Sequence, residues 1–264
     1  ITQRHIVAEG EKTSDLAFDA ATQALERANL KGRDIDLIVI ATSTPDDTFP
    51  STATRVQHML GAQQAIAFDV QAVCAGFVYA LDIADAMLRG GRGQRALVIG
   101  AESFSKILDW EDRSTCVLFG DGAGAVTLEA SQTAEGYGIL ASKLYSDGAY
   151  RDILYVDGGP SSTGKVGHLR MEGNKVFRHA VDKLSKVMDE VLDIADMQVD
   201  DVDWLVPHQA NIRIIEGMQK KMGLGDDQVV KTVHNHANTS AASIPLALAA
   251  AVDDSRIQNG QVLA

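Results

Sequence analysis

Cys74 lies at the point where a buried apolar segment gives way to a helical pattern. Apolar residues run as far as Val70, and from Phe77 to Leu88 they recur at helical spacing, which predicts a strand, a tight turn and a helix. A thiol at the start of a helix faces unpaired N–H groups and the positive end of the helix dipole, and both favour the thiolate. We therefore predict that Cys74 is a nucleophile; the alternative is that it is a small buried apolar residue.

Two other residues with suitable chemistry occur in the second half of the chain. His208 directly follows a predicted buried strand, and Asn238 occupies a polar turn before an apolar helix. Taken alone, each has an ordinary structural interpretation, as a hydrogen-bonded histidine and as a turn residue. His234 and His236 flank the same turn, but no carboxylate or open-site motif accompanies these histidines, so we expect no metal site.

The glycine-rich segment Gly120-Asp-Gly-Ala-Gly124 could suggest a nucleotide site. It lacks the Lys-Ser/Thr pair of a P-loop and does not open a helix, so a phosphate site is disfavoured. We predict instead a tight turn between strands over 115–119 and 125–129. Cys116 is then a core residue of the first of these strands.

The elements around these residues alternate between strands and helices. Asp36-Leu-Ile-Val-Ile-Ala41 is apolar enough to be buried on both faces, which is typical of a parallel sheet covered by helices. The sequence further predicts a strand at Phe68 that ends near Val70, and strands over 95–101, 138–143, 203–207 and 229–233. It predicts a loop over 157–165, helices over 16–28, 51–60, 174–192, 212–222 and 241–252, and a last strand starting at 260.

The order of elements repeats along the chain. Asp36-Leu-Ile-Val matches Asp203-Trp-Leu-Val, Leu60-Gly61 matches Met222-Gly223, and the Cys74 turn matches the Asn238 turn, at an offset of roughly 165 residues. We therefore predict two related halves, 1–137 and 138–264, packed about a pseudo-twofold axis. This symmetry would bring Cys74, His208 and Asn238 to one site. Because neither half contains every element of the other, we expect segments to be missing at both ends.

Composition narrows the classes of function. The chain has 264 residues, of which 45% are hydrophobic and 23% charged, as in an ordinary globular protein with a substantial core. Its formal net charge of −12 disfavours nucleic-acid binding, although it permits a local basic patch. The two cysteines are too few for a disulfide framework, and no segment has the pattern of a signal peptide or a membrane span. We expect a cytoplasmic protein that does not associate with membranes.

Four motifs together resemble those of the β-ketoacyl-acyl carrier protein synthase III family of the thiolase-like superfamily. They are Val73-Cys-Ala-Gly-Phe77, Phe119-Gly-Asp-Gly-Ala-Gly124, Val206-Pro-His-Gln-Ala-Asn211 and Asn238-Thr-Ser-Ala-Ala-Ser243. The resemblance spans essentially the whole chain and implies a five-layered α-β-α-β-α duplicated α/β fold and a homodimer. It also implies a decarboxylating Claisen condensation of fatty-acid synthesis. In this reaction acyl-CoA, with acetyl-CoA the expected primer, and malonyl-acyl carrier protein give 3-oxoacyl-acyl carrier protein, CO₂ and CoA, without a cofactor.

The resemblance also assigns roles to individual residues. Cys74 would carry the acyl group as a thioester, and His208 and Asn238 would donate hydrogen bonds to the thioester oxygen during decarboxylation. Further positions match binding residues of the family: Arg113, Asn211 and Arg213 for CoA, Gly173 and Phe177 for the pantetheine channel, Phe49 for the acyl pocket of a partner subunit, and Lys175, Arg178, Arg213, Lys220 and Lys221 for an acidic carrier protein. Each of the charged residues has solvated surface charge as its alternative interpretation.

The chain departs from the family pattern at one internal position and at its ends. The glycine that usually precedes the catalytic asparagine is Ala237 here, which a backbone with negative φ would tolerate. The expected missing ends include a C-terminal loop that supplies an oxyanion-hole amide. The alternatives are therefore a related condensing enzyme of secondary metabolism, a non-catalytic acyl-CoA-binding homologue, an inactive fragment, and a cysteine hydrolase.

Overall fold

The computed structural model describes residues 1–132 and 136–264 and confirms the predicted α/β fold. Two one-turn 3₁₀ segments, η2 (Val73–Ala75) and η7 (Ser240–Ala242), stand directly before the two helices nearest the candidate site. The strands are β1 (Leu37–Ala41), β2 (Ile66–Val70), β3 (Arg95–Ser103), β4 (Asp121–Glu129), β5 (Leu154–Val156) and β6 (Leu169–Met171); the helices are α1 (Thr13–Arg27), α2 (Thr52–Leu60), α3 (Gly76–Arg89), α4 (Gly173–Ala195), α5 (Ile212–Met222), α6 (Val233–His236) and α7 (Ser243–Asp253).

The main sheet has the strand order β2-β1-β3-β4. β1 runs parallel to both of its neighbours, with Val39 level with Phe68 on one side and Val98 on the other. β4 adds to β3 in the antiparallel sense. All five residues of β1 are buried, because helices cover both faces of the sheet.

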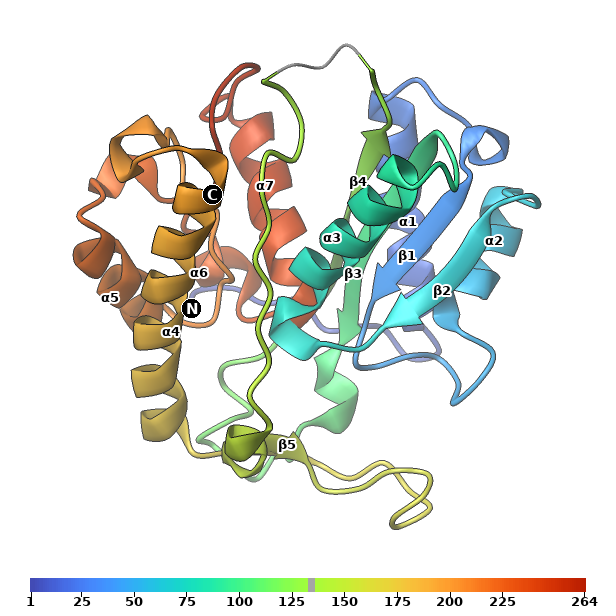
Figure 1. Cartoon of the computed structure of the whole chain (residues 1–264). Helices are drawn as coiled ribbons and strands as arrows, with labels where there is room; N and C mark the ends of the chain where they lie inside the picture. Colours follow the sequence, from blue (N-terminus) through green and yellow to red (C-terminus); the bar gives the residue numbers. More distant parts are fainter. Residues whose placement is uncertain (133–135) are drawn as a thin grey trace.

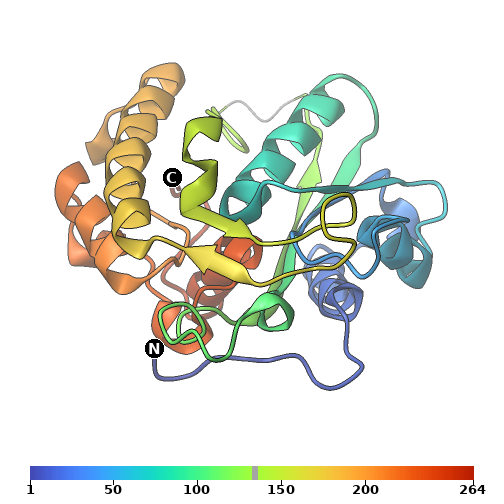
Figure 2. The same ribbon diagram turned by 90° about the horizontal axis from the view of Figure 1, so that it is seen from below.

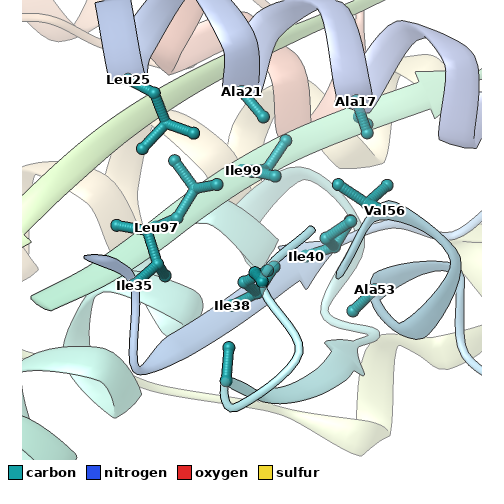
Figure 3. Close-up of a cluster of buried hydrophobic side chains, with 13 residues drawn as sticks. Ala17, Ala21, Leu25, Ile35, Ile38, Ile40, Ala53, Val56, Leu97 and Ile99 are labelled. Atoms are coloured by element: carbon teal, nitrogen blue, oxygen red, sulfur yellow. The ribbon is translucent and has the colours of Figure 1, made fainter. Parts of the chain in front are cut away.

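The two faces of this sheet contact different helices. Ile38 and Ile40 of β1 point to the face that α1 and α2 cover (Figure 3). Leu37 and Val39 alternate to the opposite face, where α3 and η7 pack. The first cluster also contains Ala17, Ala21, Leu25, Ala53, Val56, Leu97 and Ile99, and the second contains Phe77, Ala80, Ala84, Val98 and Ala241.

The second half of the chain supplies two further layers. Val206 and Val230 pack against α7, whereas Leu205 and Val229, their neighbours along the chain, pack against α5. Parallel bridges at Leu205–Val229 and Trp204–Leu263 give this layer the geometry of a small sheet. The order is therefore helix, sheet, helix, sheet, helix, which is the predicted five-layered arrangement. Figures 1 and 2 show α4 and α5 on one side of the molecule and α1 and α2 on the other.

Several predictions about strands were wrong. Residues 115–118 form turns and Phe119 makes an isolated parallel bridge to Asn238. The glycine-rich segment lies within and just before one strand, β4, instead of forming a hairpin turn. A Cβ on Gly124 would lie 2.8 Å from the backbone nitrogen of Leu246, so these glycines let α7 pack directly on the strand. The expected strand over 138–143 is irregular, and the strands expected over 203–207, 229–233 and from 260 onward are reduced to bridges.

The structure repeats local details between the two halves. Gly61 and Gly223 both end a helix in the left-handed conformation, with φ of 68° and 73°. Val73 and Ser240 both begin the turn before the following helix, with φ of 49° and 50°. Cys74 therefore corresponds in position to Ala241, while the division of the chain at 137/138 remains a prediction.

Candidate active site

Cys74 lies in η2, at the N-terminal end of α3 and beside η7. Gly76, two residues later, starts α3 at a close approach between layers. A Cβ at Gly76 would lie 3.1 Å from the Ala41 Cβ and 3.4 Å from the Ala241 Cβ. A glycine at this position therefore lets the cysteine turn approach the segment that follows Asn238.

The thiol of Cys74 is less acidic than its position predicts. Part of the residue reaches solvent, but dense protein surrounds its sulfur, and this burial raises the pKa of Cys74 to about 11. The nearby carboxyl of Glu102 also raises this pKa, whereas the neighbouring Ser240 side chain lowers it. The expectation of a resting thiolate was wrong, because burial of the sulfur disfavours its charged form.

Asn238 is fixed by its backbone and by its side-chain oxygen. Its N–H donates to the Leu118 carbonyl at 2.9 Å, and its carbonyl accepts from the Gly120 N–H at 3.0 Å. The Asn238 Oδ1 accepts from the Ser240 N–H at 2.9 Å, so the amide oxygen is assigned. Within the described ranges no acceptor is recorded for its Nδ2, which leaves an NH₂ group available to donate.

His208 contacts the same segment three residues further along. Its Nδ1 lies 2.6 Å from the Ser243 Oγ. Burial lowers the pKa of His208 to about 4, so the ring is neutral at neutral pH. Residues 238–243 thus contact all three candidate catalytic residues, because Ser240 also faces Cys74.

The backbone just before Asn238 is strained. Ala237 has φ of 61° and ψ of −164°, a region that glycine occupies readily and other residues rarely adopt. The condition of a negative φ, under which the alanine would be tolerated, is not met. The loop that presents Asn238 therefore stores backbone strain, on the order of 1–3 kcal/mol.

A buried carboxyl that the sequence did not single out stands beside this site. Glu102, at the end of β3, has no exposed surface, and burial raises the pKa of its carboxyl to about 7. Its Oε2 accepts from the Thr44 Oγ1 at 2.7 Å and from the Ser43 N–H at 3.0 Å. Its Oε1 faces Ser240 without a hydrogen bond of normal geometry. An acidic residue directly after a buried apolar strand was the signal that could have identified it.

The candidate CoA and pantetheine residues lie outside this cluster of side chains. Arg113 is exposed, and the neighbouring Asp112 accepts from Ser114 and Thr115 instead of pairing with it. The Asn211 Oδ1 caps α5 by accepting from the Ile214 N–H at 3.0 Å.

The pantetheine candidates lie on α4. Gly173 is the first residue of that helix, and both it and Phe177 are exposed. Phe177 faces Gly217, where α4 and α5 approach closely.

The candidate carrier-protein residues divide into two groups. Lys175 pairs with Glu172 at 2.7 Å and Lys221 pairs with Asp182 at 2.8 Å. The other basic side chains are exposed and have no recorded acidic partner in the part of the chain that the structure describes; they are Arg178, Arg213 and Lys220. Phe49, the candidate for contact with a partner subunit, has 83% of its surface exposed.

Two searches of the described residues bear on other classes of function. No group of three or more His, Cys, Asp or Glu side chains within 1–132 and 136–264 is arranged to hold a metal ion. Across the same ranges, every helix is too short or too polar to cross a lipid bilayer.

Comparisons with known proteins agree with one another. Two family models match, 3-oxoacyl-[acyl-carrier-protein] synthase III over residues 68–148 and its C-terminal counterpart over residues 192–264. The β-ketoacyl-[acyl-carrier-protein] synthase III of Paramagnetospirillum magneticum is 60% identical over all of this chain and 82% of its own length, and that of Sphingopyxis alaskensis is 59% identical over 98% and 81%. The crystal structure of 3-oxoacyl-[acyl-carrier-protein] synthase III from Aquifex aeolicus superimposes with a TM-score of 0.93 at 43% identity, covering 98% of this chain and 81% of that one.

Proposed function

This chain belongs to the 3-oxoacyl-[acyl-carrier-protein] synthase III family, and from that premise we propose that it performs the initiating condensation of fatty-acid synthesis through Cys74, His208 and Asn238. The enzyme is an acyl-transferring condensing enzyme. Acyl-CoA, with acetyl-CoA as the expected primer, reacts with malonyl-acyl carrier protein to give 3-oxoacyl-acyl carrier protein, CO₂ and CoA. No cofactor takes part in this scheme.

The first half-reaction transfers the acyl group to Cys74. The sulfur attacks the thioester carbon of acyl-CoA, the tetrahedral intermediate collapses, and CoA leaves as its thiol after taking up one proton. Because the pKa of Cys74 is about 11, only about one thiol in 10⁴ is ionised near pH 7, and deprotonation must accompany attack. A buried, high-pKa thiol also limits reaction with other electrophiles between turnovers.

The second half-reaction requires two hydrogen-bond donors and no charged histidine. Loss of CO₂ from the malonyl group leaves an enolate, whose oxygen is stabilised by donors already held in place. Neutral His208 can offer one ring N–H, and Asn238 can offer its Nδ2 hydrogens. The enolate carbon then attacks the acyl-Cys74 carbonyl, and the Cys74 sulfur leaves and is reprotonated.

The observation that carries this assignment is the shared contact segment. Residues 238–243 contain Asn238 itself, face Cys74 through Ser240 and hold His208 through Ser243. Two lobes thereby contribute a nucleophile from one side and a donor pair from the other. Each half-reaction can be measured separately, so the roles can be tested one at a time.

The test uses three variants of the intact protein. Cys74→Ala should take up no radiolabelled acetyl group from acetyl-CoA, whereas Cys116→Ala, which removes the other thiol, should still be labelled. His208→Ala should still be acylated on Cys74 but lose malonyl decarboxylation by roughly 10²–10³-fold. Labelling of Cys74→Ala, or equal loss of both steps in His208→Ala, would contradict the assigned roles.

We also propose that the enzyme is a homodimer joined near the free edge of β2. Among residues 1–132 and 136–264 this strand has only β1 as a neighbour, and Ile66 at its start is 45% exposed. Phe49 projects from the adjoining loop almost fully exposed, which is costly for an aromatic ring unless a partner covers it.

We propose roles for the CoA, pantetheine and carrier-protein candidates from the chemistry of their side chains. Exposed arginines such as Arg113 and Arg213 suit the phosphates of CoA, with Asn211 as a further CoA contact, and Gly173 and Phe177 are the candidates for the pantetheine chain. Arg178, Arg213 and Lys220 suit an acidic carrier protein, and Lys221 contributes less because Asp182 neutralises it. The two thiols are free, which suits the reducing cytoplasm.

A further inference from the structure

Ser243 is a buried hydroxyl with two neighbours and one hydrogen to donate. It is the first residue of α7, and only 1% of its surface is exposed. Its Oγ lies 2.6 Å from the His208 Nδ1 and accepts a hydrogen bond from the Gln209 N–H at 3.2 Å. A serine hydroxyl has one hydrogen and two acceptor positions, so these contacts constrain where the hydrogen points.

The Gln209 N–H is held rigidly in place. The Gln209 side chain has no exposed surface and makes four hydrogen bonds. Its Nε2 donates to the carbonyls of Pro207 and Val230 at 2.9 and 3.0 Å, and its Oε1 accepts from the N–H groups of Thr232 and Val233 at 2.8 and 3.1 Å. With the glutamine locked, its backbone N–H remains directed at the Ser243 Oγ.

The hydrogen-bond donors and acceptors around Ser243 then select one tautomer of the His208 imidazole. The pKa of His208 is lowered to about 4, so its ring is neutral and one nitrogen must accept. If Nδ1 carried the proton, the Ser243 Oγ would accept twice, and its buried hydrogen would have no acceptor recorded among residues 1–132 and 136–264. If Ser243 donates to Nδ1, every one of these groups is paired, and the ring proton lies on Nε2.

We infer that Ser243 is a positioning residue that fixes His208 in the tautomer with its proton on Nε2. The catalytic use of that proton rests on the proposed function, in which His208 donates to the enolate oxygen. The tautomer itself does not, because it follows from contacts within the folded chain. Ser243 does not touch substrate in this scheme and acts only through the imidazole.

The experiment is ¹⁵N NMR of the full-length protein with ¹⁵N-labelled histidine near pH 7.5. Two-bond proton–nitrogen correlations distinguish the tautomers, and the His208→Gln spectrum identifies the His208 signals among those of the seven histidines. Wild type should show the Nε2–H form. Ser243→Thr keeps the hydroxyl and should retain that form, whereas Ser243→Ala should lose the preference.

Two results would overturn the inference: an Nδ1–H form in wild type, or an unchanged spectrum in folded Ser243→Ala. The wild-type spectrum alone decides the assignment if Ser243→Ala does not fold. In activity assays Ser243→Ala should keep acylation of Cys74 while condensation falls at least about tenfold, the limit being the roughly 10⁴-fold loss of a wholly wrong tautomer. If Ser243→Ala changed the tautomer but left condensation unchanged, the result would support the positioning of His208 by Ser243 and contradict the donor role proposed for His208.

Discussion

Replacing Glu102 by glutamine should change how the stability of the protein depends on pH. Burial raises the pKa of this carboxyl from 4.5 to about 7. The folded state therefore binds the carboxyl proton more tightly than the unfolded state does. The free energy of unfolding should fall as pH rises from about 4.5 to about 7, and this contribution should be constant above that range.

The size of the effect follows from the shift in pKa. A difference of about 2.5 pH units at about 1.36 kcal/mol per unit is about 3 kcal/mol between low and neutral pH. Glutamine has no proton to bind, so this component should be absent from Glu102→Gln. The amide oxygen can still accept from Ser43 and Thr44, but the NH₂ group would face the Ala241 N–H, another donor. The pH dependence is therefore the informative quantity, and the absolute stability is not.

The assay is urea unfolding of both proteins at one protein concentration over pH 4.5–8. The free energy of unfolding of Glu102→Gln minus that of wild type should rise by about 3 kcal/mol across this range, because other titrating groups cancel in the difference. Glu129→Gln serves as control, since Glu129 is an exposed carboxylate paired with Arg95, and it should give a nearly flat difference. A flat difference for Glu102→Gln, or one that falls with pH, would refute the reasoning.

Three further variants test the packing of the site, the dimer and the docking of the carrier protein. Gly100→Ala should destabilise the protein by about 1–3 kcal/mol in urea unfolding and slow condensation, because the new Cβ would lie 2.2 Å from a carbonyl oxygen of η7. Phe49→Ser should shift the proposed dimer toward monomer in analytical ultracentrifugation, because it removes a large exposed apolar contact. Arg178→Glu with Lys220→Glu should raise the KM for malonyl-acyl carrier protein about tenfold or more at low salt and leave acylation by acetyl-CoA unchanged, because reversed charges repel an acidic partner.

Each of these has a control that the chain itself provides. Gly148→Ala adds a Cβ with no atom within 4 Å and should not destabilise the protein. Tyr137→Ser removes another exposed ring, 68% exposed, and should leave the assembly intact. Lys183→Glu with Lys186→Glu changes the net charge by the same amount, at two lysines of α4 already paired with Asp147 and Glu190, and a smaller effect on KM would separate docking from net charge. Equal effects of control and test variant would contradict the corresponding prediction.

Local patterns predicted most of the fold. The unbroken apolar run of β1 and the helical spacing after Phe77 are properties of neighbouring residues, and both elements form where expected. The glycines at 120–124 were wrongly interpreted as a turn, because what requires glycine there is a tertiary contact, the close approach of α7 to β4. The prediction of a strand over 138–143 also failed for a tertiary reason, because this segment pairs with no strand within the described ranges.

The site divides in the same way. Cys74, His208 and Asn238 could be singled out as candidates because each stands at a recognisable junction between elements and in a motif that resembles the family; their roles stay a prediction. The place of Glu102 directly after an apolar strand is visible in the sequence, but its importance depends on burial and on contact with a loop about 58 residues away, and these are not. The acidity of the thiol also escaped prediction, because the helix start is visible in the sequence and the enclosure of the sulfur is not.

The left-handed turn shared by Val73 and Ser240 has a consequence for how this architecture could be altered. Only one of the two turns is followed by a nucleophile. The turn geometry is therefore required for the contact between the two lobes and not for the chemistry of the residue that follows it. Ala241 occupies the position in the second lobe that Cys74 occupies in the first, already buried against β3. The second lobe thus offers a backbone position equivalent to that of the nucleophile but occupied by an alanine. A reactive side chain could be introduced at Ala241 by substitution, with the backbone unchanged.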